Sequence, residues 1–113
     1  MPPAPDSRIS VFVVDDHPLF RRGLVDALEE QHDLRVIGQA ATAAEAARAI
    51  PAEHPDVAIV DLSLGAESGL DLVSTLTRPG NEVRVLVVSA HDEVVHAARA
   101  FRAGALGYIM KDK

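Results

Sequence analysis

The chain has 113 residues, 48% of them hydrophobic and 25% charged, which predicts one globular domain with a single core and argues against disorder. Because 17 acidic residues outweigh 11 basic ones, the formal net charge is −6, and we expect no direct binding of nucleic acid by this segment. Cysteine is absent, which excludes disulfides, and neither a signal peptide nor a membrane-length apolar run of ~20 residues is present, so we expect a cytoplasmic protein without membrane contact.

Strand and helix patterns alternate from the N-terminal side. After a proline-rich leader, residues 1–7, which we expect to be flexible, Ile9–Val14 is a nearly continuous apolar run of the kind found in strands buried on both faces. Pro18 stands where the first turn of an amphipathic helix would begin. A weaker apolar run at residues 34–38 predicts an edge strand.

The alternation continues through the middle of the chain. Residues 42–45 read Thr-Ala-Ala-Glu, a capping box that opens an alanine-rich helix, and we expect Pro51 to end that helix. Residues 57–60 predict another buried strand, which ends in Asp61. A loop through Gly65 then leads to a third helix, which stops before a Pro-Gly pair.

The last third of the chain completes the pattern. Residues 83–88 predict a fourth strand ending at Ser89, Asp92 can cap a fourth helix that Gly104 stops, and residues 107–110 predict a fifth strand. Such alternation with short connections predicts a doubly wound α/β fold with a parallel five-stranded sheet. A helix that would follow the fifth strand is absent from this chain.

Polar residues follow four of these strands. The carboxyl ends of parallel strands share one edge of the sheet, where ligands bind in open α/β folds. Three carboxylates packed together hold protons or recruit a hard cation, and Mg²⁺, which prefers oxygen ligands, suits such a cluster. A lysine and a hydroxyl beside them would bind a phosphoryl group. Any of the aspartates could be a covalent nucleophile, and the central strand favours Asp61. The converging residues are Asp15, Asp16, Asp61, Ser89 and Lys111.

Four short segments resemble response-regulator receiver domains. They are Val-Val-Asp-Asp-His-Pro at 13–18, Asp-Leu-Ser at 61–63, Ser-Ala at 89–90 and Gly-Tyr-Ile-Met-Lys at 107–111. The resemblance covers residues 9–111, and it implies a flavodoxin-like sheet with strand order 2-1-3-4-5 in a receiver domain spanning residues 8–113. The first segment and its continuation are similar to the NarL/LuxR branch, whose members carry a helix-turn-helix domain after the receiver.

The resemblance also implies a mechanism. The phosphoacceptor receives a phosphoryl group from a sensor histidine kinase in the presence of Mg²⁺, and the added charge of about −1.5 to −2 changes partner or homodimer contacts. DNA would be bound only by a C-terminal domain beyond this chain, and no enzymatic activity beyond self-phosphotransfer and autodephosphorylation is expected. The implied roles are phosphoacceptor for Asp61, metal binding for Asp15, Asp16, Asp61 and the Ser63 backbone carbonyl, and phosphate binding or switching for Ser89, Lys111 and Tyr108.

Three departures from the family pattern affect these expectations. Leu64-Gly65 replaces the Met-Pro pair of many receivers, and Asp112 stands where many have proline, so no cis-proline turn is expected. The absent fifth helix leaves the usual dimer face incomplete. The five histidines, at 17, 32, 54, 91 and 96, show no paired metal-ligand spacing and are interpreted as surface or loop residues, although His17 beside the acidic pair could tune the site.

Other functions share parts of this pattern. A haloacid-dehalogenase-like phosphatase also uses an aspartate nucleophile with Mg²⁺, but it requires a second aspartate where this chain has Ser63, and a cap domain. A flavin or nucleotide binder of the same fold would need a glycine-rich phosphate loop in place of Asp15-Asp16-His17-Pro18. A receiver that only dimerises, without phosphorylation, is a further alternative. Taken singly, Asp15 could be a helix cap and Lys111 a solvated lysine.

Overall fold

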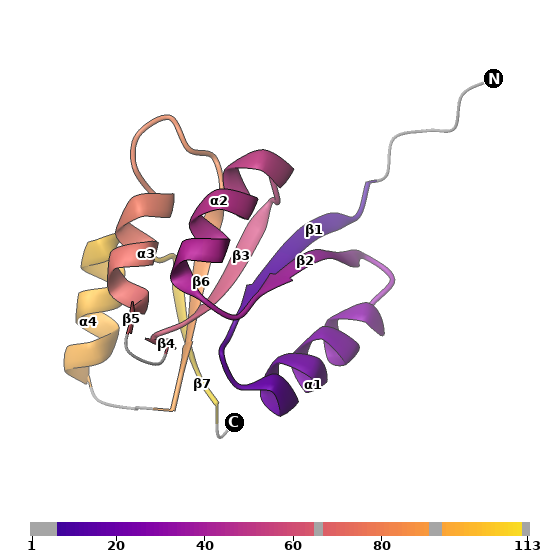
Figure 1. Cartoon of the computed structure of the whole chain (residues 1–113), viewed down its shortest axis with the longest axis horizontal. Helices are drawn as coiled ribbons and strands as arrows, with labels where there is room; N and C mark the ends of the chain where they lie inside the picture. The colour runs from indigo at the N-terminus through magenta and orange to yellow at the C-terminus, as the bar shows by residue number, and fades with distance from the viewer. Residues whose placement is uncertain (1–6, 65–66, 91–93, 112–113) are drawn as a thin grey trace.

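The computed structural model describes residues 7–64, 67–90 and 94–111. Its main sheet has five parallel strands in the order β2-β1-β3-β6-β7 (Figure 1). In chain order of these strands, this is the predicted arrangement 2-1-3-4-5. The five strands are β1 (Ile9–Val14), β2 (Leu34–Ala40), β3 (Val57–Asp61), β6 (Arg84–Ser89) and β7 (Gly107–Met110).

Helices cover both faces of the sheet. In Figure 1, α1 lies alone on one face, while α2, α3 and α4 pack on the other. Within the described residues no helix follows β7, and Ile109 on that strand is 47% exposed. None of the helices in the described ranges is long and apolar enough to cross a membrane. The helices are α1 (Pro18–Glu29), α2 (Ala43–Glu53), α3 (Gly69–Leu76) and α4 (Val94–Ala103).

The core consists of two layers, one on each side of the sheet. The larger layer joins strand residues such as Phe12 and Val60 to the buried faces of α2 and α3. The smaller layer lies under α1 and contains Val11, Val13 and Ile59. The residues of β1 point alternately into the two layers, so this strand is buried from Ser10 onward, as its continuous apolar run predicts.

Helix α2 begins as predicted but ends later. Thr42 is the N-cap residue, as predicted: its side chain accepts a hydrogen bond of 3.1 Å from the backbone N–H of Glu45. The expectation that Pro51 ends the helix is wrong, because α2 continues to Glu53 and the chain turns at His54, which is left-handed with φ 52°. A proline this close to the helix end removes one backbone hydrogen bond without blocking the last turn.

The connection from β3 to α3 is more ordered than a loop. Two short antiparallel strands, β4 (Ser63–Leu64) and β5 (Glu67–Ser68), form a separate ladder between them. The ladder replaces the predicted loop, and β2 extends to Ala40 and not only to residue 38. Both differences arise because strand pairing depends on a partner strand, which the residue pattern of one segment does not reveal. Gly104 ends α4 with φ 117°, as predicted, and no cis peptide bond occurs in the described residues. The predicted roles of Gly65, Asp92 and Asp112 lie outside the described residues.

Candidate functional site

The acidic residues meet at the carboxyl ends of β1 and β3, which are neighbours in the sheet. Asp15 directly follows β1, where its backbone N–H donates to the carbonyl of Ala40 on β2. Asp61 is the last residue of β3, and its neighbours in the sheet are β1 and β6. Since β2 and β3 lie on opposite sides of β1, this is the point where the chain connections diverge and where ligands bind in such folds.

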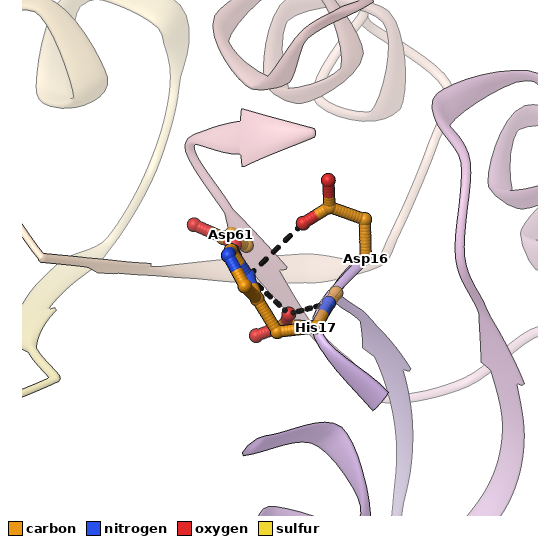
Figure 2. A group of neighbouring side chains, drawn as sticks. Asp16, His17 and Asp61 are labelled. Carbon is orange, nitrogen blue, oxygen red and sulfur yellow. Dashed lines mark hydrogen bonds and ion pairs between the residues drawn. The ribbon is translucent and has the colours of Figure 1, made fainter. Parts of the chain in front are cut away.

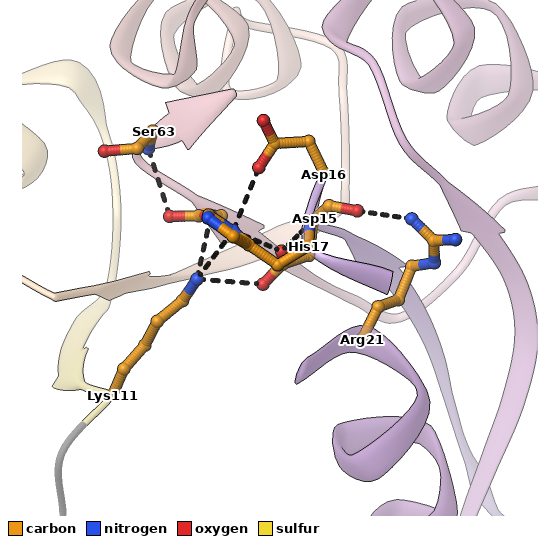
Figure 3. A network of polar contacts seen from close by, with 7 residues as sticks. Asp15, Asp16, His17, Arg21, Ser63 and Lys111 are labelled. Atoms are coloured by element: carbon orange, nitrogen blue, oxygen red, sulfur yellow. Dashed lines mark hydrogen bonds and ion pairs between the residues drawn. The ribbon is translucent and has the colours of Figure 1, made fainter. Parts of the chain in front are cut away.

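Lys111 reaches this cluster from the end of β7. Its Nζ lies 3.0 Å from Asp61 Oδ2 and 3.3 Å from Asp15 Oδ2 (Figure 3). Burial by itself lowers the pKa of Lys111, but the hydrogen bond and charge of Asp61, with the charge of Asp15, outweigh it and hold that pKa above its usual value. The ammonium is therefore charged and offsets part of the carboxylate repulsion.

The second oxygen of Asp61 is bound by the chain that follows it. Asp61 Oδ1 accepts a hydrogen bond of 3.0 Å from the backbone N–H of Ser63. The first residue of α3, Gly69, packs so closely on this turn that a Cβ there would lie 2.6 Å from the Asp61 backbone oxygen. The Asp61 side chain, 1% exposed, is thus bound on both oxygens and fixed in orientation.

Asp15 is fixed in a similar way. Its Oδ1 accepts a hydrogen bond of 2.7 Å from the backbone N–H of His17, the N-cap residue of α1, so Asp15 orders the turn before the helix but does not cap it. Arg21 of α1 donates to the Asp15 backbone oxygen over 2.6 Å and to Gln39 on β2. The side chain of Asp15 nevertheless points into the cluster, where Lys111 contacts its other oxygen.

Asp16 differs from the other two aspartates. Its side chain is 28% exposed, yet its Oδ1 is buried and has no hydrogen-bond partner within the described part of the chain. The ligand atoms of Asp15, Asp16, His17 and Asp61 all lie within 4.8 Å of one another. A buried carboxylate oxygen without a donor, among two further carboxylates, fits a bound divalent cation.

His17 contacts all three aspartates, which its sequence context hardly indicates. Its Nδ1 lies 3.2 Å from Asp15 Oδ1, 3.0 Å from Asp16 Oδ1 and 3.4 Å from Asp61 Oδ2 (Figure 2). The interpretation of His17 as an ordinary surface residue is therefore incomplete, although its side chain is 59% exposed. The only sequence signal was its position directly after the acidic pair.

Ser89 and Tyr108 occupy the neighbouring strands. Ser89 is fully buried at the end of β6, and its backbone oxygen accepts from the N–H of Lys111 over 2.8 Å. Tyr108 is half-buried on β7 and packs against the core layer under α2, α3 and α4. Both residues lie on strands whose carboxyl ends share the edge of the sheet at which Asp61 lies.

Residues 11–113 match the family model described as "Response regulator receiver domain". The chain belongs to the response-regulator receiver family. This domain is 39% identical over 104 residues to the DNA-binding transcriptional activator DevR/DosR of Mycobacterium tuberculosis, covering 92% of this chain and 48% of that protein. It is 38% identical over 110 residues to NarL of the same organism, covering 97% of this chain and 50% of that protein.

Solved structures agree with this assignment. The signal receiver domain of NarL from Mycobacterium tuberculosis superposes with a TM-score of 0.89 at 37% identity, covering 95% of this chain and 86% of that one. A LuxR-family two-component response regulator from Aurantimonas has the same TM-score of 0.89 at 32% identity, covering 95% of this chain and 76% of that one. The domain is therefore of the NarL/LuxR type, and it spans about half the length of the curated relatives it matches.

The family assignment disfavours the other functions considered. A dehalogenase-like phosphatase would need a carboxylate where the receiver domain has Ser63, which instead begins β4 and donates its N–H to Asp61. A flavodoxin-like phosphate loop is replaced by an acidic segment after β1. The domain is regulatory rather than catalytic in its family.

Proposed function

We propose that Asp61 is the phosphoacceptor of this receiver domain and that a sensor histidine kinase is its phosphoryl donor. The observation that carries the proposal is the position of Asp61, at the end of the central strand, hydrogen-bonded to Lys111 and facing two further aspartates. A carboxylate that is buried and fixed on both oxygens is oriented for attack on an incoming phosphorus atom.

The transfer conserves atoms and charge. An Asp61 oxygen forms a bond to the phosphorus of the kinase phosphohistidine while the phosphorus–nitrogen bond breaks, and the leaving imidazole regains its proton from solvent. Lys111 then exchanges its contact with the Asp61 oxygen for the phosphoryl oxygens, whose negative charge its ammonium stabilises. Ser89 and Tyr108 act as switch residues that respond to the new phosphoryl group.

The cluster also suits a resident Mg²⁺ ion. Asp16 and Asp61, with the backbone carbonyl of Ser63, would hold the ion, and Asp15 would contribute through a bound water. When bound, the ion neutralises charge on the transferring phosphoryl group. The buried Asp16 Oδ1 without a donor supports this assignment. In a similar structure from Burkholderia pseudomallei, 32% identical with a TM-score of 0.82, a response regulator holds a phosphorylated aspartic acid and a calcium ion.

The output of the switch lies in contacts with other domains. The relatives are about twice as long as this chain and include a DNA-binding transcriptional activator, which supports an attached DNA-binding domain as the controlled element. Phosphorylation at Asp61 would change partner or homodimer contacts and thereby the state of that domain. We place this function in the cytoplasm, where a sensor kinase and DNA are both accessible.

Exposure to acetyl phosphate with Mg²⁺ tests the proposal. Intact-mass measurement should show one labile phosphoryl group on the wild-type protein and none on Asp61→Asn. The matched control is Asp56→Asn, which changes an aspartate at the opposite end of β3 and should leave phosphorylation intact. A phosphoryl group on Asp61→Asn, or none on the wild type, contradicts the assignment, and the latter result favours a receiver that only dimerises.

A further inference from the structure

The imidazole of His17 occupies a position that helix capping does not explain. His17 is the N-cap residue of α1, but its side chain forms no capping hydrogen bond with the described start of that helix. The ring instead turns toward the ends of β1 and β3, where Nδ1 lies between Asp16 and Asp61 (Figure 2). The exposed side chain of His17 therefore contacts the acidic cluster through Nδ1.

The neighbours of Nδ1 carry charges of both signs. Nδ1 lies 3.3 Å from Lys111 Nζ and 3.2 Å from Asp15 Oδ1. Asp16 Oδ1 lies 3.0 Å from Nδ1, and this oxygen has no hydrogen-bond partner among the described residues. The ligand atoms of His17 and the three aspartates all lie within 4.8 Å of one another, close enough for a single cation to contact all four side chains.

The spacing of these atoms matches the edges of a coordination shell. In an octahedral site with metal–ligand distances of about 2.0 to 2.1 Å, adjacent ligand atoms are about 2.9 Å apart. Nδ1 lies 3.0 Å from Asp16 Oδ1, 3.2 Å from Asp15 Oδ1 and 3.4 Å from Asp61 Oδ2. His17 therefore stands at the distance from the carboxylates that a fourth ligand of the same ion would take.

We propose that His17 supplies a nitrogen ligand to the metal site and shifts its preference toward transition-metal dications such as Mn²⁺, Co²⁺ and Ni²⁺ relative to Mg²⁺. The inference rests on the proposed function, because it assumes a cation among the three aspartates. Imidazole binds borderline metals well, whereas Mg²⁺ favours oxygen, so one nitrogen added to an all-oxygen site changes selectivity more than overall affinity. The domain then takes its metal according to which dication the cell supplies.

An alternative role for the same contacts is that of a stand-in cation. A protonated His17 among the carboxylates would mimic the metal and would have to leave before any dication bound. The two roles predict opposite effects of removing the ring: a ligand loses transition-metal affinity, whereas a stand-in gains affinity for every dication alike.

Metal titrations of the full chain distinguish these roles. Dissociation constants for Mg²⁺, Co²⁺ and Ni²⁺ are measured by isothermal titration for the wild type, His17→Ala and a control, His32→Ala, which changes an exposed histidine after α1. We expect His17→Ala to lose at least about tenfold in Co²⁺ and Ni²⁺ affinity, with a smaller change for Mg²⁺, and His32→Ala to match the wild type. Electron spin echo measurements with Mn²⁺ should show a directly coordinated nitrogen that His17→Ala lacks.

Each outcome separates the inference from the function on which it rests. If His17→Ala changes the three affinities equally, raises them together, or leaves the manganese nitrogen signal in place, His17 is not a ligand. If Mg²⁺ binds the wild type and is lost in Asp16→Asn, the metal site of the proposed function holds whatever His17 does. If no dication binds the wild type, both the metal site and the role of His17 are overturned.

Discussion

Lys111 Nζ donates a hydrogen bond of 3.0 Å to Asp61 Oδ2 and thereby joins the end of β7 to the end of β3 across the intervening strand β6. The backbone N–H of Lys111 is bound to Ser89 at the end of β6 as well. Lys111 thus connects the ends of β3, β6 and β7 through hydrogen bonds, one of them to the carboxylate that would receive a phosphoryl group. We therefore expect a change at Asp61 to affect β6 and β7.

Removing Lys111 should destabilise the metal-free protein. In Lys111→Met, Asp61 and Asp15 lose the ammonium that pairs with them, and we expect a loss of about 1 to 3 kcal/mol in the free energy of unfolding at neutral pH. The pKa of Lys111 is raised in the folded state. The stability that the ion pair contributes is therefore fully present below about pH 10.5 and is lost as the pH rises through the folded pKa. Urea denaturation of both proteins from neutral to alkaline pH measures this, and an unchanged difference at high pH would argue against the pair.

Mg²⁺ should stabilise the folded protein through Asp16. A ligand that binds only the native state adds about 2.7 kcal/mol at a concentration a hundredfold above its dissociation constant. Asp16→Asn removes the charge of a side chain whose buried oxygen has no donor among the described residues, so the melting temperature of this variant should no longer respond to Mg²⁺ or to EDTA. The matched control is Asp26→Asn on α1, which should retain the full response, and an equal response in Asp16→Asn would exclude Asp16 as a ligand.

Gly69 should be intolerant of a side chain. In Gly69→Ala the new Cβ would lie 2.6 Å from the Asp61 backbone oxygen and 2.7 Å from Leu62 atoms, all of them backbone, so the turn after Asp61 must shift. We expect destabilisation of about 1 to 3 kcal/mol together with slower phosphorylation by acetyl phosphate.

Gly23 offers the control for that substitution. Within α1 a Cβ at Gly23 meets nothing within 4 Å, so Gly23→Ala should stabilise the protein by about 0.5 to 1 kcal/mol and leave phosphorylation unchanged. Urea denaturation compares the two variants. Equal stability of Gly69→Ala and the wild type would show that the turn is free to adjust.

Asp56 should contribute to stability in a pH-dependent way at the opposite end of the sheet. The backbone and side-chain hydrogen bonds of Ser10 hold the pKa of Asp56 below its usual 3.8. A pKa that is lower in the folded state gives stability that is fully present above pH 3.8 and is lost as the pH falls through the folded pKa. The stability difference between the wild type and Asp56→Asn should therefore shrink under acid denaturation, and a constant difference down to low pH would exclude this linkage.

The resemblance to receiver domains predicted the fold, and the strand-end positions predicted which side chains meet at one edge of the sheet. Apolar runs and residue composition identify the buried strands. Because a parallel sheet brings the residues that follow its strands to one edge, the sequence alone predicts that Asp15, Asp61 and Lys111 lie close together. The prediction that Pro51 ends α2 is wrong because a proline in the last turn removes one backbone hydrogen bond and leaves the turn intact. The β4–β5 ladder was missed because two-residue strands carry no periodic signal.

The sequence by itself determined which chemical groups the domain has and in what order its strands present them, because apolar period, glycine positions and strand-end polar residues are local properties. Only the tertiary structure decided how these groups contact one another: that Lys111 binds Asp61 across β6, that Asp16 keeps an oxygen without a donor, and that His17 turns its ring toward the carboxylates. Those contacts depend on side-chain direction and on the register of strands distant in sequence, which no local pattern encodes.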